Sequence, residues 1–120
     1  MKTTELNKIS EQMARQMRRG VLELCILSIV SEKEAYPSDI IQELKASKLI
    51  VVEGTLYPLL SRLKDQGLLQ YNWRESSMGP PRKYYSITDT GREFLGSLKD
   101  TWEQLVEAVN HSTKNNSTNE

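Results

Sequence analysis

The sequence has little of the chemistry on which enzymes and secreted proteins depend. Its 120 residues include one cysteine, Cys25, and one histidine, His111. A single cysteine excludes a disulfide within the chain and fits a reducing compartment, and we interpret Cys25 as a small buried hydrophobe rather than a reactive thiol. The sequence has no Gly-rich phosphate loop, metal-ligand spacing or acid–base constellation. We therefore expect no enzyme, no metal and no cofactor.

Long apolar runs are also missing. The longest, residues 21–30, carries Glu23 and is shorter than the roughly 18 apolar residues of a membrane span. The first residues do not resemble a signal peptide. We therefore expect a cytoplasmic protein with no membrane partner.

The chain has no excess of charge of either sign, because 16 Lys and Arg balance 16 Asp and Glu. Taken alone, a net charge of zero argues against a nucleic-acid partner. The charges are unevenly distributed, however. Basic residues prevail in 1–20 and 53–87, and acidic residues prevail in 21–52 and 88–120. The sequence therefore predicts a polarised molecule.

The most informative pattern lies in residues 53–67. Leu56, Leu60 and Leu63 recur at the spacing of one helix face. The other side is polar, aromatic and cationic; it comprises Tyr57, Ser61 and Lys64, with Pro58 and Arg62 beside them. Short helices of this kind enter the major groove of DNA, although most amphipathic helices are ordinary surface helices.

The ends of this helix are marked in the sequence. Gly67 follows the last periodic residue and suits a left-handed stop. Pro58 is compatible with a helix that begins near Gly54 or Thr55, where its missing N–H would have no partner anyway.

A second helix is predicted just upstream, over residues 36–45. Pro37 suits its first position and Asp39 its first turn, while Ile40, Ile41 and Leu44 face inward. Residues 50–52 are predicted to form a short strand. Two short helices joined by a tight connection make a helix-turn-helix.

A β-hairpin is predicted downstream. Leu69, Tyr71 and Trp73 alternate with polar residues, and a second alternating run, 82–87, follows a turn-rich break at 76–81. Arg82 and Lys83 give the hairpin a basic shoulder. A hairpin after a helix-turn-helix makes a winged helix, whose wing contacts phosphates; the alternative is a solvated hairpin without a partner.

Two further helices flank this unit. Residues 5–18 carry a narrow apolar stripe, Leu6, Ile9, Met13 and Met17, and Gly20 is expected to separate them from residues 21–30, a central buried helix or, by composition alone, a strand. Thr88 caps a C-terminal helix whose seam is Leu95, Leu98, Trp102, Leu105 and Val109. We predict that both stripes form a homodimer interface; the alternative is that they cover the domain's own core.

Three blocks, 54–63, 67–69 and 82–91, resemble the PadR family of bacterial transcriptional regulators. The resemblance covers about residues 18–92 and extends to the smaller subfamily that includes the multidrug-responsive repressor LmrR. It implies a dimeric winged-helix repressor that binds double-stranded DNA. The expected DNA-binding residues are Ser38, Thr55, Tyr57, Pro58, Ser61, Arg62, Lys64, Arg82 and Lys83. It also implies a planar hydrophobic ligand held by Trp102, Met13 and Leu98.

The sequence thus predicts a mainly α fold with a small β-wing. Residues 1–110 would form one winged-helix domain, composed of an N-terminal helix (1–20), the winged helix-turn-helix (21–87) and a C-terminal dimerisation helix (88–110). Residues 111–120 would be a disordered polar tail. The expected function is a sequence-specific repressor on a palindromic operator. The alternative is a winged helix that binds protein without specific DNA binding.

Overall fold

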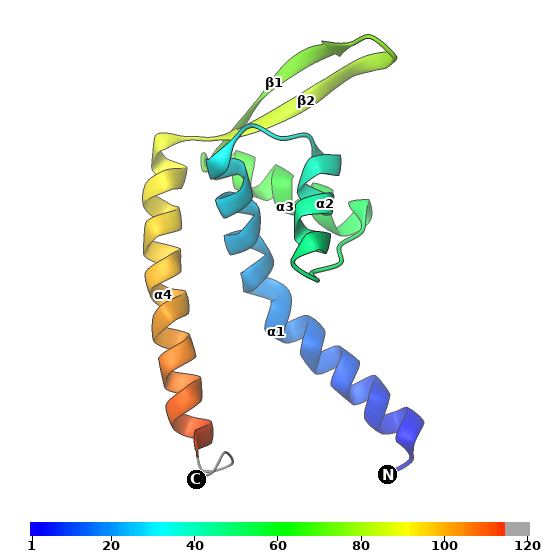
Figure 1. The fold of residues 1–120 in the computed structure, drawn as a ribbon, viewed down its shortest axis with the longest axis vertical. Coiled ribbons are helices and arrows are strands. Elements are labelled where there is room, and N and C mark those ends of the chain that lie inside the picture. The colour runs from blue at the N-terminus through cyan, green and yellow to red at the C-terminus, as the bar shows by residue number, and fades with distance from the viewer. Residues whose placement is uncertain (115–120) are drawn as a thin grey trace.

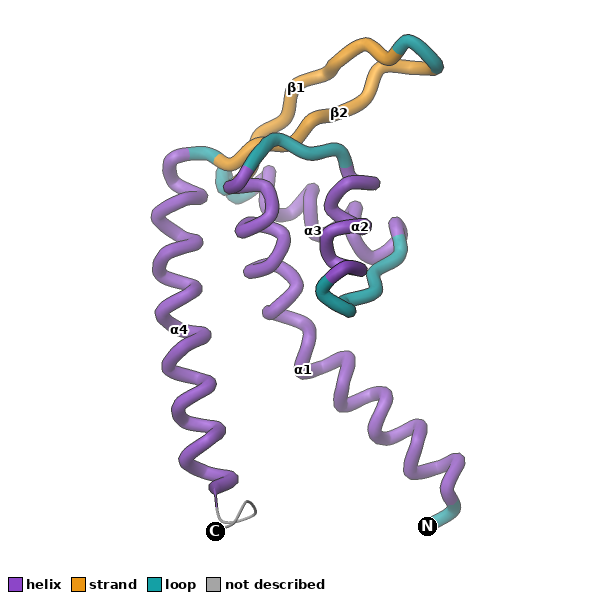
Figure 2. The backbone as a smooth tube through the Cα atoms, viewed as in Figure 1, coloured by secondary structure: helices purple, strands orange, loops and turns teal. Residues whose placement is uncertain are grey.

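The computed structural model describes residues 1–114 and has two long helices, two short helices and a hairpin (Figure 1). In chain order the elements are α1 (Thr3–Glu32), α2 (Pro37–Ala46), α3 (Glu53–Asp65), β1 (Leu69–Ser76), β2 (Gly79–Ile87) and α4 (Asp89–Thr113). The short helices pack beside the C-terminal half of α1, and the hairpin projects beyond them (Figures 1 and 2). This mainly α winged-helix architecture confirms the predicted fold class.

The core forms where α1, α2, α3 and the base of the hairpin meet. The predicted inner face of α3 is confirmed, since Leu56, Leu60 and Leu63 are completely or almost completely buried. They pack with side chains from every other element; the cluster includes Ile26, Leu27, Val30, Ile40, Leu44, Leu69, Tyr85, Ile87 and Leu95. Burial of this apolar surface fixes the position of α3 and leaves its other side exposed.

Helix α1 is continuous, so the predicted break at Gly20 is wrong. A Cβ at Gly20 would meet nothing within 4 Å, and the helix runs through it from Thr3 to Glu32. Glycine in a helix interior costs only about 1 kcal/mol relative to alanine, which strong helix formers on both sides offset. Residues 21–30 are part of this helix, as predicted, and do not form the strand that their composition alone also allowed.

The predicted strand at 50–52 is also wrong. Within the described part of the chain this segment is an extended connection between α2 and α3, and the only sheet is the antiparallel pair of β1 and β2. Residues 50–52 are all β-branched, but a strand also needs a neighbouring strand to complete its backbone hydrogen bonds. The hairpin instead meets the α1–α2 connection, through an isolated bridge between Ala35 and Tyr85.

The C-terminal end of α3 is as predicted, but its proline is not where we expected. Gly67 has φ +79°, and the Leu68 N–H donates to the Leu63 carbonyl at 2.9 Å. The helix begins at Glu53, so Pro58 is its sixth residue rather than a first-turn residue. The carbonyl of Gly54 therefore lacks its usual helical donor.

The hairpin and α4 follow their sequence signals. Leu69 pairs with Ile87 and Tyr71 with Tyr85, and these residues of the predicted apolar face pack on the core, whereas Trp73 of the same face is 61% exposed. Thr88 caps α4 by accepting a hydrogen bond from the Gly91 N–H at 2.9 Å. Helix α4 continues to Thr113, so His111 is helical and the predicted tail begins too early. Residues 115–120 of that tail lie outside the described residues.

Candidate nucleic-acid interface

One hollow brings together predicted DNA contacts from three elements. It has a volume of about 630 Å³ and lies between the N-terminus of α2, the outer side of α3 and strand β2. Five expected residues line it: Ser38, Tyr57, Ser61, Arg82 and Lys83. Sequence analysis missed the other lining residues Tyr36, Pro37, Glu53, Trp73, Pro81 and Tyr85. Their common signal is proximity to the helix-turn-helix and the wing.

Aromatic rings hold the wing cations. The Lys83 ammonium lies 4.4 Å from the Tyr71 ring centroid and 5.4 Å from that of Trp73, and the Arg82 guanidinium lies 5.1 Å from that of Tyr36. Neither cation forms an ion pair within the described residues. Their charge is therefore positioned without being neutralised, as a phosphate contact requires.

Arg74 fastens the wing to the α1–α2 connection. Its guanidinium pairs with both carboxylate oxygens of Glu34, one at 2.8 Å, and lies 4.0 Å from the Tyr84 ring centroid. Tyr84 contacts Tyr36 with ring centroids 3.8 Å apart. Hydrogen bonding to Tyr84 raises the pKa of Tyr36 above its ordinary value. Glu34 lies 40 residues from Arg74 in the sequence, so the alternating pattern of β1 could not predict this ion pair.

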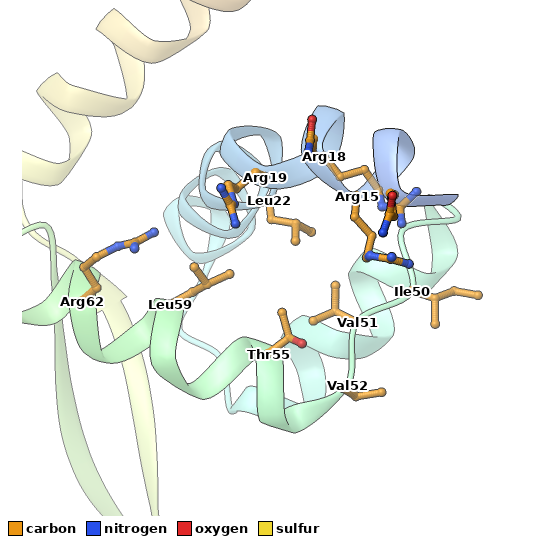
Figure 3. A pocket seen from close by; sticks show the side chains of 12 residues that line it. Arg15, Arg18, Arg19, Leu22, Ile50, Val51, Val52, Thr55, Leu59 and Arg62 are labelled. Atoms are coloured by element: carbon orange, nitrogen blue, oxygen red, sulfur yellow. The ribbon is translucent and has the colours of Figure 1, made fainter. Parts of the chain in front are cut away.

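Arg62 and Thr55 do not join this hollow. The Arg62 guanidinium lies 2.8 Å from the Glu23 carboxylate on α1. Arg62 and Thr55 instead line a second hollow on the α1 side of α3, drawn in Figure 3. Pro58 and Lys64 are exposed on α3 without lining either hollow, and the Lys64 ammonium lies 3.8 Å from the Asp65 carboxylate.

The predicted dimer stripes are exposed on the free ends of the two long helices. Leu6, Ile9, Met13 and Met17 on α1, and Trp102, Leu105 and Val109 on α4, are all exposed. Leu95 is different, because it is 8% exposed and packs in the core of its own chain, with Leu98 partly buried against that core. Leu95 therefore cannot serve the exposed seam, and the alternative that it covers the domain's own core holds for this position.

A small hollow of about 260 Å³ lies between α1 and α4, beside Trp102. Its lining is mostly apolar: Met17, Gly20, Val21, Leu24, Leu98, Thr101, Trp102 and Leu105. Two of the three expected ligand-binding residues, Trp102 and Leu98, line it, and Met13 does not.

Residues 1–114 contain no cluster of three or more His, Cys, Asp or Glu side chains that could hold a metal ion. None of the helices in this range is long and apolar enough to cross a membrane.

Comparison with known families agrees with this geometry. The model of the transcriptional regulator PadR-like family matches residues 26–97, which covers the helix-turn-helix, the wing and the start of α4. The chain belongs to the PadR-like family. A transcriptional regulator of Mycobacterium tuberculosis is 34% identical over 95 residues, which cover 79% of this chain and 88% of that protein.

Solved structures extend the likeness to PadR regulators in three dimensions. A PadR-like transcription factor from Bacteroides fragilis is 57% identical, with a TM-score of 0.72 over 83% of this chain and 97% of that one. A PadR family regulator from Eggerthella lenta is 32% identical, with a TM-score of 0.84 over 98% of this chain and 100% of that one. The family consists of DNA-binding transcriptional regulators and not of enzymes, and this PadR chain is one of them.

Proposed function

We propose that this PadR-like protein is a homodimeric repressor that binds a palindromic operator. The observation that carries the proposal is the hollow where Tyr57 and Ser61 of α3 lie beside the wing cations Arg82 and Lys83. Helix α3 would enter a major groove, while the wing would contact the adjacent backbone. In a two-fold symmetric dimer the two copies of α3 would lie about one turn of the DNA helix apart, ~34–36 Å.

Dimerisation is supported by the exposed apolar stripes. Met17 is 72% exposed and Leu105 is 52% exposed in the single chain. Apolar residues at regular helical spacing on unsupported helix ends are typical of a protein interface. The proposed interface comprises Leu6, Ile9, Met13, Met17, Leu98, Trp102, Leu105 and Val109.

A planar aromatic ligand is the proposed effector, bound against Trp102 and Leu98 with Met13 supplied by the dimer interface. The hollow beside Trp102 supports this proposal, since a flat ring can stack on an indole. Titration with a planar dye such as acridine should quench the fluorescence of wild-type protein, and the quenching should be lost in Trp102→Ala. Trp73 is the tryptophan that remains in this variant, and its fluorescence gives the background. Equal quenching of the variant would place the dye elsewhere.

The DNA proposal is tested by fluorescence anisotropy with a labelled duplex that the protein selects from a random pool. Binding should be tighter than to an unrelated duplex of equal length and should weaken as salt rises. Lys64→Ala should weaken binding to both duplexes and lower the salt slope by about one unit for each subunit of the dimer, because one phosphate per subunit is no longer neutralised. An unchanged slope would remove Lys64 from the phosphate contacts.

The second candidate is a winged helix that binds a protein partner. The zero net charge favours it. Counterion release makes DNA binding strongly dependent on salt. Weak binding that is equal for both duplexes and insensitive to salt would therefore favour the protein partner.

A further inference from the structure

The second hollow, on the α1 side of α3, is strongly basic. Its volume is about 730 Å³, and its walls are α1, the α2–α3 connection and α3 (Figure 3). Four arginines line it, Arg15, Arg18, Arg19 and Arg62. The rest of the lining is neutral: Gln12, Gln16, Leu22, Ile50, Val51, Val52, Thr55 and Leu59. With no carboxylate in this lining, the hollow favours an anionic occupant.

The three arginines of α1 have no acidic partner in the described part of the chain. The ion pairs there involve Arg62, Lys64 and Arg74. Arg15 and Arg19 are four residues apart on one helix, where like charges repel each other. An anion bound in the hollow would reduce this repulsion.

This surface is separate from the proposed dimer interface. Gln12, Arg15 and Arg19 line the basic hollow, whereas Met13 and Met17 do not. Figure 3 shows Arg19 and Leu22 of α1 facing Leu59 of α3 across the hollow. The apolar stripe of α1 therefore belongs to the proposed dimer interface, while the arginines of α1 line the basic hollow.

The N-terminus of α3 opens on the same hollow. Val52, which has no side chain that can cap a helix, precedes its first turn, and Thr55 lines the hollow. The helix dipole favours negative charge at this point, where Glu53 of the first turn already supplies one carboxylate and the Thr55 N–H donates to the Val52 carbonyl at 3.0 Å. The arginines of α1 therefore carry the argument for an anionic occupant.

We propose that the basic hollow binds the sugar-phosphate backbone of DNA, with Arg15, Arg18 and Arg19 contacting phosphates. The exposed ridge of α3 that carries Pro58 lies between this hollow and the wing-side hollow. A helix in a major groove has a phosphate backbone on each side. The wing cations hold one strand and the α1 arginines hold the other, while Ile50 and Val52 pack against deoxyribose. This inference rests on the DNA-binding function proposed above.

The test compares three double variants of the full-length protein by fluorescence anisotropy over a series of salt concentrations. Arg15→Ala/Arg19→Ala removes two charges from the hollow. Lys33→Ala/Lys99→Ala removes two charges from positions that do not line it. Arg15→Lys/Arg19→Lys keeps the charge. Alanine and lysine are strong helix formers, so all three variants should fold, which circular dichroism checks.

We expect the alanine pair in the hollow to lower the salt slope by about 0.9 for each phosphate that is no longer neutralised, about two units per chain. The decrease should be the same on selected and unrelated duplexes, because phosphates carry no sequence information. The lysine pair should retain most of the slope, and the control pair should retain all of it.

Two results would overturn the inference, and they are distinguishable. If the wild-type protein binds DNA and the alanine pair has an unchanged slope, the hollow does not contact the backbone. If the wild-type protein binds neither duplex in a salt-dependent manner, the proposed function fails and the inference fails with it.

Discussion

Gly91 shows how one residue joins the wing to α4. A Cβ built at this position would lie 2.1 Å from the carbonyl oxygen of Leu68 and 2.7 Å from Cγ1 of Ile87. The first of these neighbours is backbone and cannot rotate away. The turn before β1 and the first turn of α4 can pack this closely only if residue 91 has no side chain.

Gly91→Ala should therefore lower the free energy of unfolding by roughly 1–3 kcal/mol, measured by urea denaturation. Gly96→Ala is the matched control in the same helix, because a Cβ there meets nothing within 4 Å. That variant should gain about 0.5–1 kcal/mol from its better helix propensity. Equal stability of the two variants would contradict the close packing at Gly91.

Cys25 gives a prediction about pH. Burial raises the pKa of its thiol, so the folded chain keeps a proton that the unfolded chain releases. The contribution to stability is fully present below the ordinary thiol pKa and is lost as pH rises above it. Alkylation by iodoacetamide should be slower in the folded than in the urea-unfolded chain, with a gap that narrows at high pH. Equal rates at pH 8 would refute the burial effect.

The elements themselves were largely predictable, and the reasons are local. The stripe of Leu56, Leu60 and Leu63 defines α3, Gly67 ends it, and Thr88 begins α4. Each of these signals acts within a few residues of the feature that it specifies. Periodicity and capping chemistry therefore suffice to predict them.

The predictions that failed depend on residues outside the local pattern. The break at Gly20 is absent because helix-forming residues continue α1 on both sides of it, and residues 50–52 form no strand because no second strand lies beside them. In the candidate site, periodicity assigned Arg62 to the polar face of α3, but could not predict that Glu23 on α1 holds its guanidinium. The basic hollow combines α1 with α3, which no local pattern relates.

The N-terminus of α4 depends on one side chain. The Thr88 hydroxyl accepts from the Gly91 N–H at 2.9 Å and donates to the Gly67 carbonyl at 2.7 Å. Thr88→Ala should lower the free energy of unfolding by about 1 kcal/mol, measured by urea denaturation. Thr90→Ala, exposed in the same first turn, should change it much less. A similar decrease in both variants would mean that the cap contributes little.

At the scale of the molecule, the chain is extended rather than round. Its principal extents are 56 × 35 × 23 Å, and the free ends of α1 and α4 diverge from each other (Figure 1). Most of the exposed large apolar side chains lie on those ends. Such a shape exposes surface that a second copy of the chain would cover.

Leu105→Glu should therefore convert a dimer into a monomer, measured by sedimentation velocity. Leu105 is exposed in the single chain, so the variant should fold normally, yet a glutamate in an apolar interface would be desolvated without a partner. Gln104→Glu adds the same charge to the next residue of the helix, outside the apolar stripe, and should leave the mass unchanged. A monomeric wild-type protein, or a dimeric Leu105→Glu variant, would contradict the proposed interface.

The uninterrupted α1 has a mechanical consequence. Its 30 residues make a rod about 45 Å long, one half embedded in the core behind α3 and the other half projecting freely. Figure 1 shows its axis bending near the middle, but the helix is not interrupted, so a tilt of its free end would reach the half that packs beside α3. In a dimer joined through its α1 helices, these helices would set the distance between the two copies of α3. DNA sites whose halves are moved out of phase by half a helical turn would then be rejected by geometry alone, even with every base contact intact.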